Sequence, residues 1–164
     1  MPDLVNVVQR LLVSTIPDWE ALSRWYYTLS EPHFIVTPQM RELVAELITG
    51  KQTEREKIEA IFQWVSQKVR YMGITVEAEA PGYEPHDTTL TFENRHGVCR
   101  DKAALLVVLL REAGFKAYPV IIHNGPKKDP EVPQPYFNHA ISSIELEDGS
   151  YLLMDSTDET TKEL

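Results

Sequence analysis

Hydrophobic residues in the first half of the chain recur every three or four positions, which is the spacing of a helix that buries one face. The pattern predicts helices over residues 4–12, 19–29, 38–48 and 54–69. No comparable alternation of apolar and polar residues occurs before residue 115. We therefore expect the first half of the chain to be helical.

Two of these helices begin with recognisable caps. Thr37 followed by Pro38 is an N-cap with proline at the first helical position, and Thr53 with Glu56 forms a capping box. Trp64 and Tyr71 lie in or just beyond the fourth helix. Core packing is the simplest interpretation of both aromatic side chains.

The middle of the chain combines an irregular segment with a fully apolar one. Residues 77–94 contain two prolines, one glycine and several polar residues, and this composition predicts a long loop. Residues 103–110 are apolar without interruption, after Cys99 and before a stop at Gly114. A helix that is apolar on every side belongs in the middle of a fold, and we expect Cys99 to lie at its start.

The pattern changes to strands after Gly114. Residues 117–122, 137–146 and 151–155 are rich in apolar and β-branched residues, and residues 124–135 form a proline-rich loop between the first two. The last two strands are joined through Glu147-Asp148-Gly149-Ser150, a hairpin sequence. Helices followed by an antiparallel sheet define an α+β fold class.

Length and charge limit the kind of protein. A chain of 164 residues can form one ordinary domain with a real core. The net charge of −9 argues against a nucleic-acid partner or an anionic membrane surface. The longest apolar run has eight residues, far below the roughly 20 that span a bilayer, and no signal peptide is evident.

The domain organisation follows from the same patterns. We expect a helical N-terminal extension over residues 1–36 and the main domain over residues 37–164. The polar tail at residues 158–164 comes soon after the last strand, which indicates a domain of a larger protein with further domains.

Cys99 is the single cysteine, so it can form neither an internal disulfide nor a multi-cysteine zinc site. A lone cysteine is by default a small buried hydrophobe. Its place at a helix start changes that interpretation, because the unpaired amides of the first turn and the helix dipole stabilise a thiolate. Gly97 allows a close approach of backbone or substrate. These features favour a nucleophile.

A thiolate nucleophile needs a histidine partner and a residue that orients this histidine. His139 begins a predicted strand directly after the proline-rich loop, and Asp155 ends the next strand of the same hairpin. The other four histidines are weaker candidates: His33 has no obvious partner, His86 lies in the long loop, His123 ends a strand, and His96 could line the mouth of the site.

The hairpin register decides whether His139 and Asp155 share a face. A two-residue turn pairs positions whose numbers sum to 297 and sends Asp155 to the opposite face. A three-residue loop with Gly149 in the left-handed conformation makes the sum 296, which places Asp155 opposite Ile141 and on the face of His139. The proposed pair therefore requires an odd loop or a bulge.

Five segments together resemble the bacterial transglutaminase-like core domain, especially the branch that follows an all-β domain of unknown function in exported bacterial proteins. The resemblance covers roughly residues 37–157, with the Cys, His and Asp motifs in the family's order. The segments are the helix pair at 37–71, RHGVCRDKA at 95–103, FKAYPV at 115–120, FNHAI at 137–141 and LMDST at 153–157.

The resemblance implies a papain-like α+β fold in which Cys99 is the nucleophile, His139 the general base and then acid, and Asp155 the residue that orients the imidazole. The Cys99 N–H is the obvious first oxyanion donor. The second donor stays open among four candidates, which are Tyr71, Trp64, Asn94 and His96. The resemblance also implies a peptide or protein substrate, an exported parent (periplasmic or cell envelope), and neither cofactor nor metal.

Three kinds of function remain to be distinguished, and the first is an acyl-transfer enzyme with two possible outcomes. A thioester intermediate resolved by water gives a peptidase or amidase, and resolution by an amine gives a transferase or cross-linking enzyme. We favour hydrolysis because no calcium-binding loop of the EF-hand type is present. A non-catalytic binding module is the second possibility. A metal site of His96, Cys99 and His139 is the third, and it lacks the paired short spacings of structural zinc sites.

Overall fold

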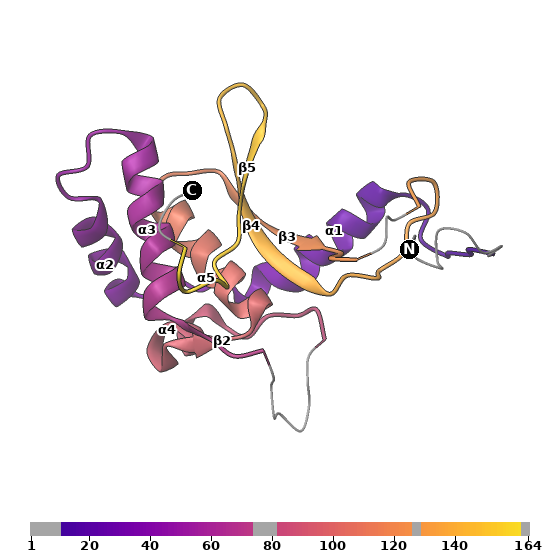
Figure 1. Cartoon of the computed structure of the whole chain (residues 1–164), viewed down its shortest axis with the longest axis horizontal. Coiled ribbons are helices and arrows are strands. Elements are labelled where there is room, and N and C mark those ends of the chain that lie inside the picture. The colour runs from indigo at the N-terminus through magenta and orange to yellow at the C-terminus, as the bar shows by residue number, and fades with distance from the viewer. Residues whose placement is uncertain (1–10, 74–81, 126–128, 162–164) are drawn as a thin grey trace.

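The computed structural model describes residues 11–73, 82–125 and 129–161. All the helices of the described residues precede the three strands of the main sheet, which segregates helices and sheet as in an α+β fold (Figure 1). The helical elements are α1 (Trp19–Ser30), the 3₁₀ helix η2 (Glu31–His33), α2 (Pro38–Ile48), α3 (Glu54–Lys68), α4 (Thr88–Asn94) and α5 (Cys99–Glu112). The strands are β1 (Arg70–Tyr71), β2 (His96–Gly97), β3 (Ala117–Ile122), β4 (His139–Glu145) and β5 (Tyr151–Met154).

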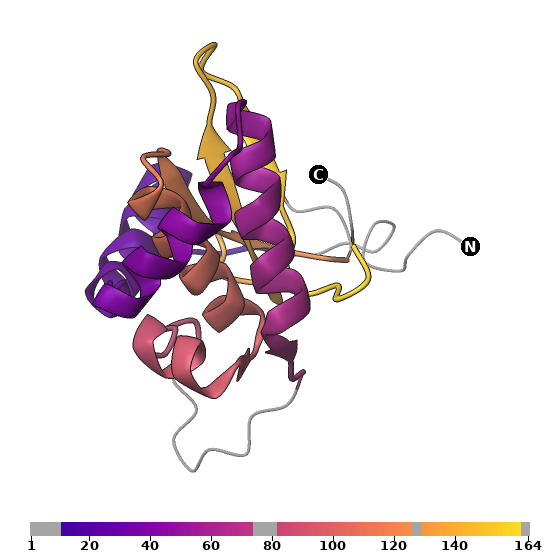
Figure 2. The ribbon, with the colours of Figure 1, turned by 90° about the vertical axis from the view of Figure 1, so that its left-hand side faces the viewer.

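Helix α5 is the centre of the molecule. Every residue from Asp101 to Leu110 is buried, as the uninterrupted apolar run predicts. Helices α2 and α3 pack on one side of α5, with their apolar faces in the same core cluster, and the sheet lies on another side. Figure 2 shows α3 beside α5 and α4 below them. The helix that begins with Cys99 is therefore held from several directions.

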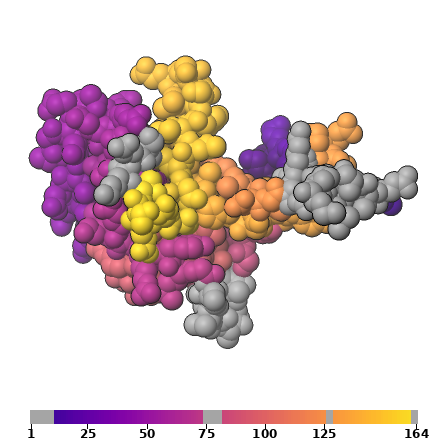
Figure 3. Space-filling model, in the orientation of Figure 1, coloured from indigo at the N-terminus to yellow at the C-terminus, as the bar shows by residue number. Residues whose placement is uncertain are grey.

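The main sheet is antiparallel with the strand order β3-β4-β5. In the β4–β5 hairpin Ser142 pairs with Met154 and Glu145 with Tyr151, so paired numbers sum to 296. Gly149 has φ +80°, and its N–H donates to the Leu146 carbonyl at 2.9 Å. The three-residue loop with a left-handed glycine is thus confirmed. The hairpin tip stands clear of the body of the molecule (Figure 3).

A short parallel pair, β1 with β2, joins the end of α3 to the segment before α5. Tyr71 pairs with Gly97, and the Met72 N–H donates to the Gly97 carbonyl at 3.0 Å. Two residues are too few to leave an alternating pattern in the sequence, so this pairing was not predicted. Because Gly97 precedes Cys99 by two residues, this pairing holds the Tyr71 backbone close to the start of α5.

Two sequence-based expectations are wrong and a third lies largely outside the described residues. The expected long loop over residues 77–94 contains helix α4, whose residues Thr88, Thr91 and Phe92 are buried. Tyr71 is 37% exposed and is not packed in the core. The helix expected at residues 4–12 falls mostly on residues that the structure does not describe, and Leu11 and Leu12 are not helical.

Candidate active site

Cys99 is the first residue of α5 and is half-buried. The Val98 carbonyl accepts hydrogen bonds from the N–H groups of Asp101 and Lys102, at 3.1 and 3.0 Å. The Cys99 N–H has no hydrogen-bond partner in the part of the chain that is described, as expected for the first turn of a helix. This free donor lies beside the thiol, where an oxyanion would form.

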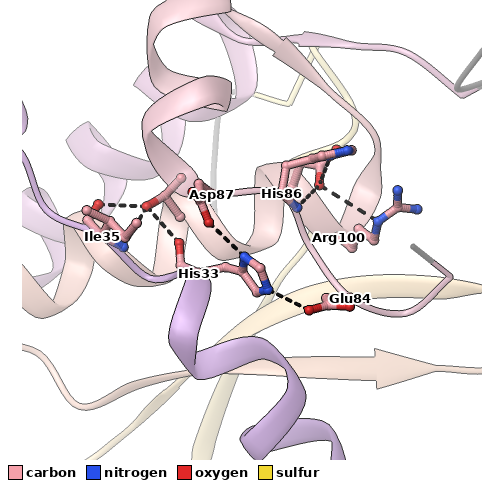
Figure 4. Close-up of polar contacts among 8 residues, drawn as sticks. His33, Ile35, Glu84, His86, Asp87 and Arg100 are labelled. Carbon is pink, nitrogen blue, oxygen red and sulfur yellow. Dashed lines mark hydrogen bonds and ion pairs between the residues drawn. The ribbon is translucent and has the colours of Figure 1, made fainter. Parts of the chain in front are cut away.

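The start of α5 is fixed by the buried carboxylate of Asp101. Its Oδ2 accepts from the Val98 N–H at 3.1 Å, and its Oδ1 accepts from the His86 N–H at 3.0 Å. The His86 ring nitrogen Nδ1 lies 3.1 Å from the same Oδ1 (Figure 4). Asp101 therefore ties the loop before α4 to the turn that presents Cys99.

His139 and Asp155 meet at the open end of the hairpin. His139 Nε2 lies 2.7 Å from Asp155 Oδ2, and the side chain and N–H of Thr157 both donate to Asp155 Oδ1. Burial opposes ionisation of Asp155, but the hydrogen bonds from His139 and Thr157 outweigh burial and lower the pKa of the carboxyl. An ionised Asp155 at Nε2 leaves Nδ1 of the imidazole as the nitrogen that can accept a proton.

Two contacts between α5 and the sheet show which ends lie together. The Ser142 hydroxyl donates to the Ala103 carbonyl at 3.1 Å, one helical turn after Cys99. At the other end of the helix, Arg111 Nε donates to the Ala117 carbonyl at 2.8 Å, and Ala117 pairs with Ile144. Strand β4 and helix α5 consequently run in the same direction, and His139 begins β4 at the Cys99 end.

Of the four oxyanion candidates, Tyr71 is the one whose phenol interacts electrostatically with Cys99 and Asp155. Burial, a Cys99 thiolate and the Asp155 carboxylate, in that order, raise the pKa of its phenol. Trp64 instead stacks on Phe92 at 5.8 Å between ring centroids, with the Arg95 guanidinium 4.5 Å from its ring, and contributes to the core. Asn94 and His96 are exposed at the end of α4 and in β2.

Lys102 is a second buried charge that sequence reasoning missed. It is fully buried one turn after Cys99, and its ammonium donates to the Ser66 and Val69 carbonyls at the end of α3. Burial lowers the pKa of Lys102 to about 8, against the opposing effects of Glu159 and Asp155. The only signal in the sequence was a lysine directly before an apolar run, which ordinarily marks an exposed first turn.

His33, which had no obvious partner in the sequence, lies between two carboxylates (Figure 4). Its Nδ1 is 2.7 Å from Asp87 Oδ1, and its Nε2 is 2.7 Å from Glu84 Oε1. Burial opposes protonation, but the two carboxylates outweigh burial and raise the pKa of the imidazole. This bridge holds η2 against the segment that precedes α4.

Replacing His33 by glutamine should therefore destabilise the protein in a pH-dependent way. A raised histidine pKa stabilises the folded state below the ordinary pKa of about 6.5, and the contribution disappears as the pH rises through the folded-state value. We expect a loss of about 1 kcal/mol at pH 5.5, because the partners are partly exposed, and less at pH 8.5. Urea unfolding at both pH values measures this; an equal loss at both contradicts the charged bridge.

Among the described residues there is neither a cluster of three or more histidine, cysteine or acidic side chains placed to bind a metal ion, nor a helix long and apolar enough to cross a membrane.

The arrangement is that of an α+β protein of the papain-like kind, with a cysteine at the start of a buried helix and a His–Asp pair on the adjoining sheet. The profile of the Transglutaminase-like superfamily matches residues 41–156, which is more than half of the chain. The chain belongs to this superfamily. No curated protein matches it.

Solved structures share the fold at low sequence identity. A candidate protease of Parabacteroides distasonis superimposes with a TM-score of 0.64 at 18% identity, covering 86% of this chain and 27% of that one. A candidate cysteine protease of Cytophaga hutchinsonii gives 0.54 at 20%, covering 77% and 41%. The periplasmic domain of TgpA from Pseudomonas aeruginosa gives 0.52 at 22%, covering 80% and 49%. The chain thus spans less than half of each of these proteins.

Proposed function

We propose that the chain is a cysteine-nucleophile acyl-transfer enzyme that acts on amide bonds through Cys99, His139 and Asp155. The observation that carries the proposal is the 2.7 Å contact between His139 Nε2 and Asp155 Oδ2. His139 begins β4, and the contact of Ser142 with Ala103 indicates that this end of β4 lies toward the start of α5. A histidine oriented by a carboxylate, next to a thiol at a helix N-terminus, is the arrangement that activates cysteine.

In the proposed reaction His139 Nδ1 takes the Cys99 proton, and the thiolate attacks the amide carbon. The Cys99 N–H stabilises the oxyanion, and the Tyr71 hydroxyl is our choice for the second donor, because the Cys99 charge acts on it. The imidazolium then protonates the leaving amine, which leaves a thioester on Cys99. Asp155 stabilises the imidazolium throughout.

Water is the second acceptor that we favour, so the enzyme is a peptidase or amidase whose substrate is a peptide or protein. Attack of water on the thioester, with His139 as base, releases the acid and restores the thiol. We further propose that the chain is part of an exported protein with additional domains, by analogy with the periplasmic domain of TgpA, which shares its fold.

The reactivity of the thiol at pH 6 tests the proposal without knowledge of the substrate. An ordinary thiol with a pKa of about 8.5 is almost entirely protonated there and reacts slowly with iodoacetamide. We expect Cys99 to be alkylated at least about tenfold faster than free cysteine at pH 6, because the imidazolium and the helix amides stabilise the thiolate.

The His139→Ala variant is the matched control, because it leaves the helix start unchanged and removes the imidazole. Its alkylation rate at pH 6, followed by mass spectrometry, should fall toward that of free cysteine. Equal rates in both proteins would mean that His139 does not activate Cys99, and the proposed triad would then be wrong.

A further inference from the structure

A groove of about 610 Å³ lies between α1 and the sheet, on the sheet face that carries His139 and Asp155. In the sheet register Tyr118 pairs with Ser143 and Val120 with Ile141, so these residues share the face of His139. The groove is lined by these two β3 residues, by Leu153 and by residues of α1, and none of its lining side chains is charged.

The groove does not include the proposed triad but lies beside it. Phe137 is one of the lining residues and precedes His139 by two residues. Tyr26 of α1 lines the groove as well, and the charge of a Cys99 thiolate acts on its phenol. These two lining residues connect the groove with the candidate site, Phe137 by its place in the chain and Tyr26 by its interaction with the Cys99 charge.

Helix α1 contacts loop residues outside the sheet at two points. Trp19 Nε1 donates to the Pro130 carbonyl at 2.7 Å, and the Trp25 ring meets Tyr83 edge-on at 5.9 Å. No α1 residue belongs to the core cluster of the described chain, and α1 precedes the part that the superfamily profile matches, which begins at residue 41. The groove wall is thus a feature of this chain rather than of the matched family segment.

Tyr26 brings an unused hydrogen-bond donor to this groove. Its side chain is 4% exposed, and its hydroxyl makes no hydrogen bond within the described ranges. Burial, together with the nearby Cys99 charge, raises the pKa of the phenol, which therefore stays protonated. The hydroxyl is not among the fully buried side-chain atoms that lack a partner, so water can reach it, and a ligand carbonyl would take the place of that water.

We propose that the groove binds the peptide substrate by a bulky uncharged side chain, aromatic or branched aliphatic, next to the bond that Cys99 attacks, with Tyr26 donating to a backbone carbonyl. The inference rests on the proposed function for its occupant, but the binding step does not require turnover. A charged side chain is disfavoured because the groove is lined by no residue of opposite charge to compensate its lost hydration.

Peptide binding to the full-length Cys99→Ala protein tests the groove, because this variant cannot consume the peptide. Blocked peptides Ac-Ala-Xaa-Ala-Gly-NH₂ with Xaa as Phe, Leu, Glu or Lys are titrated by calorimetry. Burial of the apolar side chain should make the Phe and Leu peptides bind at least about tenfold more tightly than the Glu and Lys peptides.

Three further variants, each in the Cys99→Ala background, locate the binding site. Ser23→Trp fills the groove from an exposed position of α1 and should weaken binding of the Phe peptide about tenfold or more. Thr28→Trp, exposed on the same helix but outside the groove, should leave it unchanged. Tyr26→Phe keeps the ring and removes the hydroxyl, and it should lower the affinity for every peptide that binds by several-fold.

Equal affinity for the four peptides, or equal effects of Ser23→Trp and Thr28→Trp, would overturn the groove proposal. Cleavage of peptides by the wild-type protein without any preference for Phe or Leu would overturn it too, while the proposed function would stand. Selective binding by a protein whose Cys99 shows no acyl-transfer activity would support the groove and overturn the proposed function.

Discussion

Cys99→Ala is expected to abolish amide cleavage, with a fall in kcat/KM of at least about 10⁴-fold. The reason is that no other described side chain at the start of α5 can form the thioester. Hydrolysis of an unstructured, fluorescently quenched protein substrate measures the effect. Because Cys99 is half-buried and alanine suits the first turn of a helix, the free energy of unfolding, measured with urea, should change by less than about 1 kcal/mol.

Asp155→Asn is the companion variant that separates the orienting role from the nucleophile. It preserves the size of the side chain but weakens the partner of His139 Nε2, which should lower kcat by about 10²-fold or more while KM changes little. Activity that persists at the wild-type level in Cys99→Ala, after purification from a separate expression strain, would refute the mechanism for both residues.

Leu106→Ala is expected to have the largest effect on stability. Leu106 is fully buried in the middle of α5, where helices from one side and the sheet from the other leave no room to close a cavity. Truncation of such a leucine costs about 3 kcal/mol, which is a large part of the total stability of a domain of this size. Urea unfolding of both proteins measures the loss.

The matched control is Leu90→Ala, the same truncation at a leucine that is 48% exposed on α4. Its effect should stay within about 0.5 kcal/mol. If the two variants unfold at the same urea concentration, α5 is not the centre of the cooperative unit that unfolds.

The parts of the fold that follow from local pattern were predicted well. The apolar run after Cys99 predicted a central helix, and Gly149 favoured the odd loop that the proposed pair of His139 and Asp155 needs. In both cases a few residues that are neighbours in the sequence indicate the local structure. The α+β class and the bounds of β3 followed in the same way.

Features that depend on distant partners could not be predicted. Helix α4 is stabilised by Thr88, whose hydroxyl donates to the Ile35 carbonyl and accepts from the Ile35 N–H, and nothing near Thr88 in the sequence reveals this. The buried Lys102 finds its acceptors at the end of α3, some 35 positions earlier. Tyr26 lines the groove beside the candidate site only because α1 lies across that groove from the sheet.

The division into an extension over residues 1–36 and a main domain from residue 37 stays a prediction. His33 forms hydrogen bonds to side chains of residues 84 and 87, and α1 lines the groove beside the candidate site. We therefore expect removal of residues 1–36 to alter the site and not merely to shorten the chain.

The hairpin register has a consequence for how this chain can change in evolution. Residues at the exposed tip, between Leu146 and Ser150, can be inserted or deleted without altering which residues of β4 and β5 pair. A single insertion inside β5, between Tyr151 and Met154, would instead turn Asp155 to the opposite face from His139. Active relatives should accordingly differ freely in length at the tip, whereas length changes within β5 should come in pairs of residues.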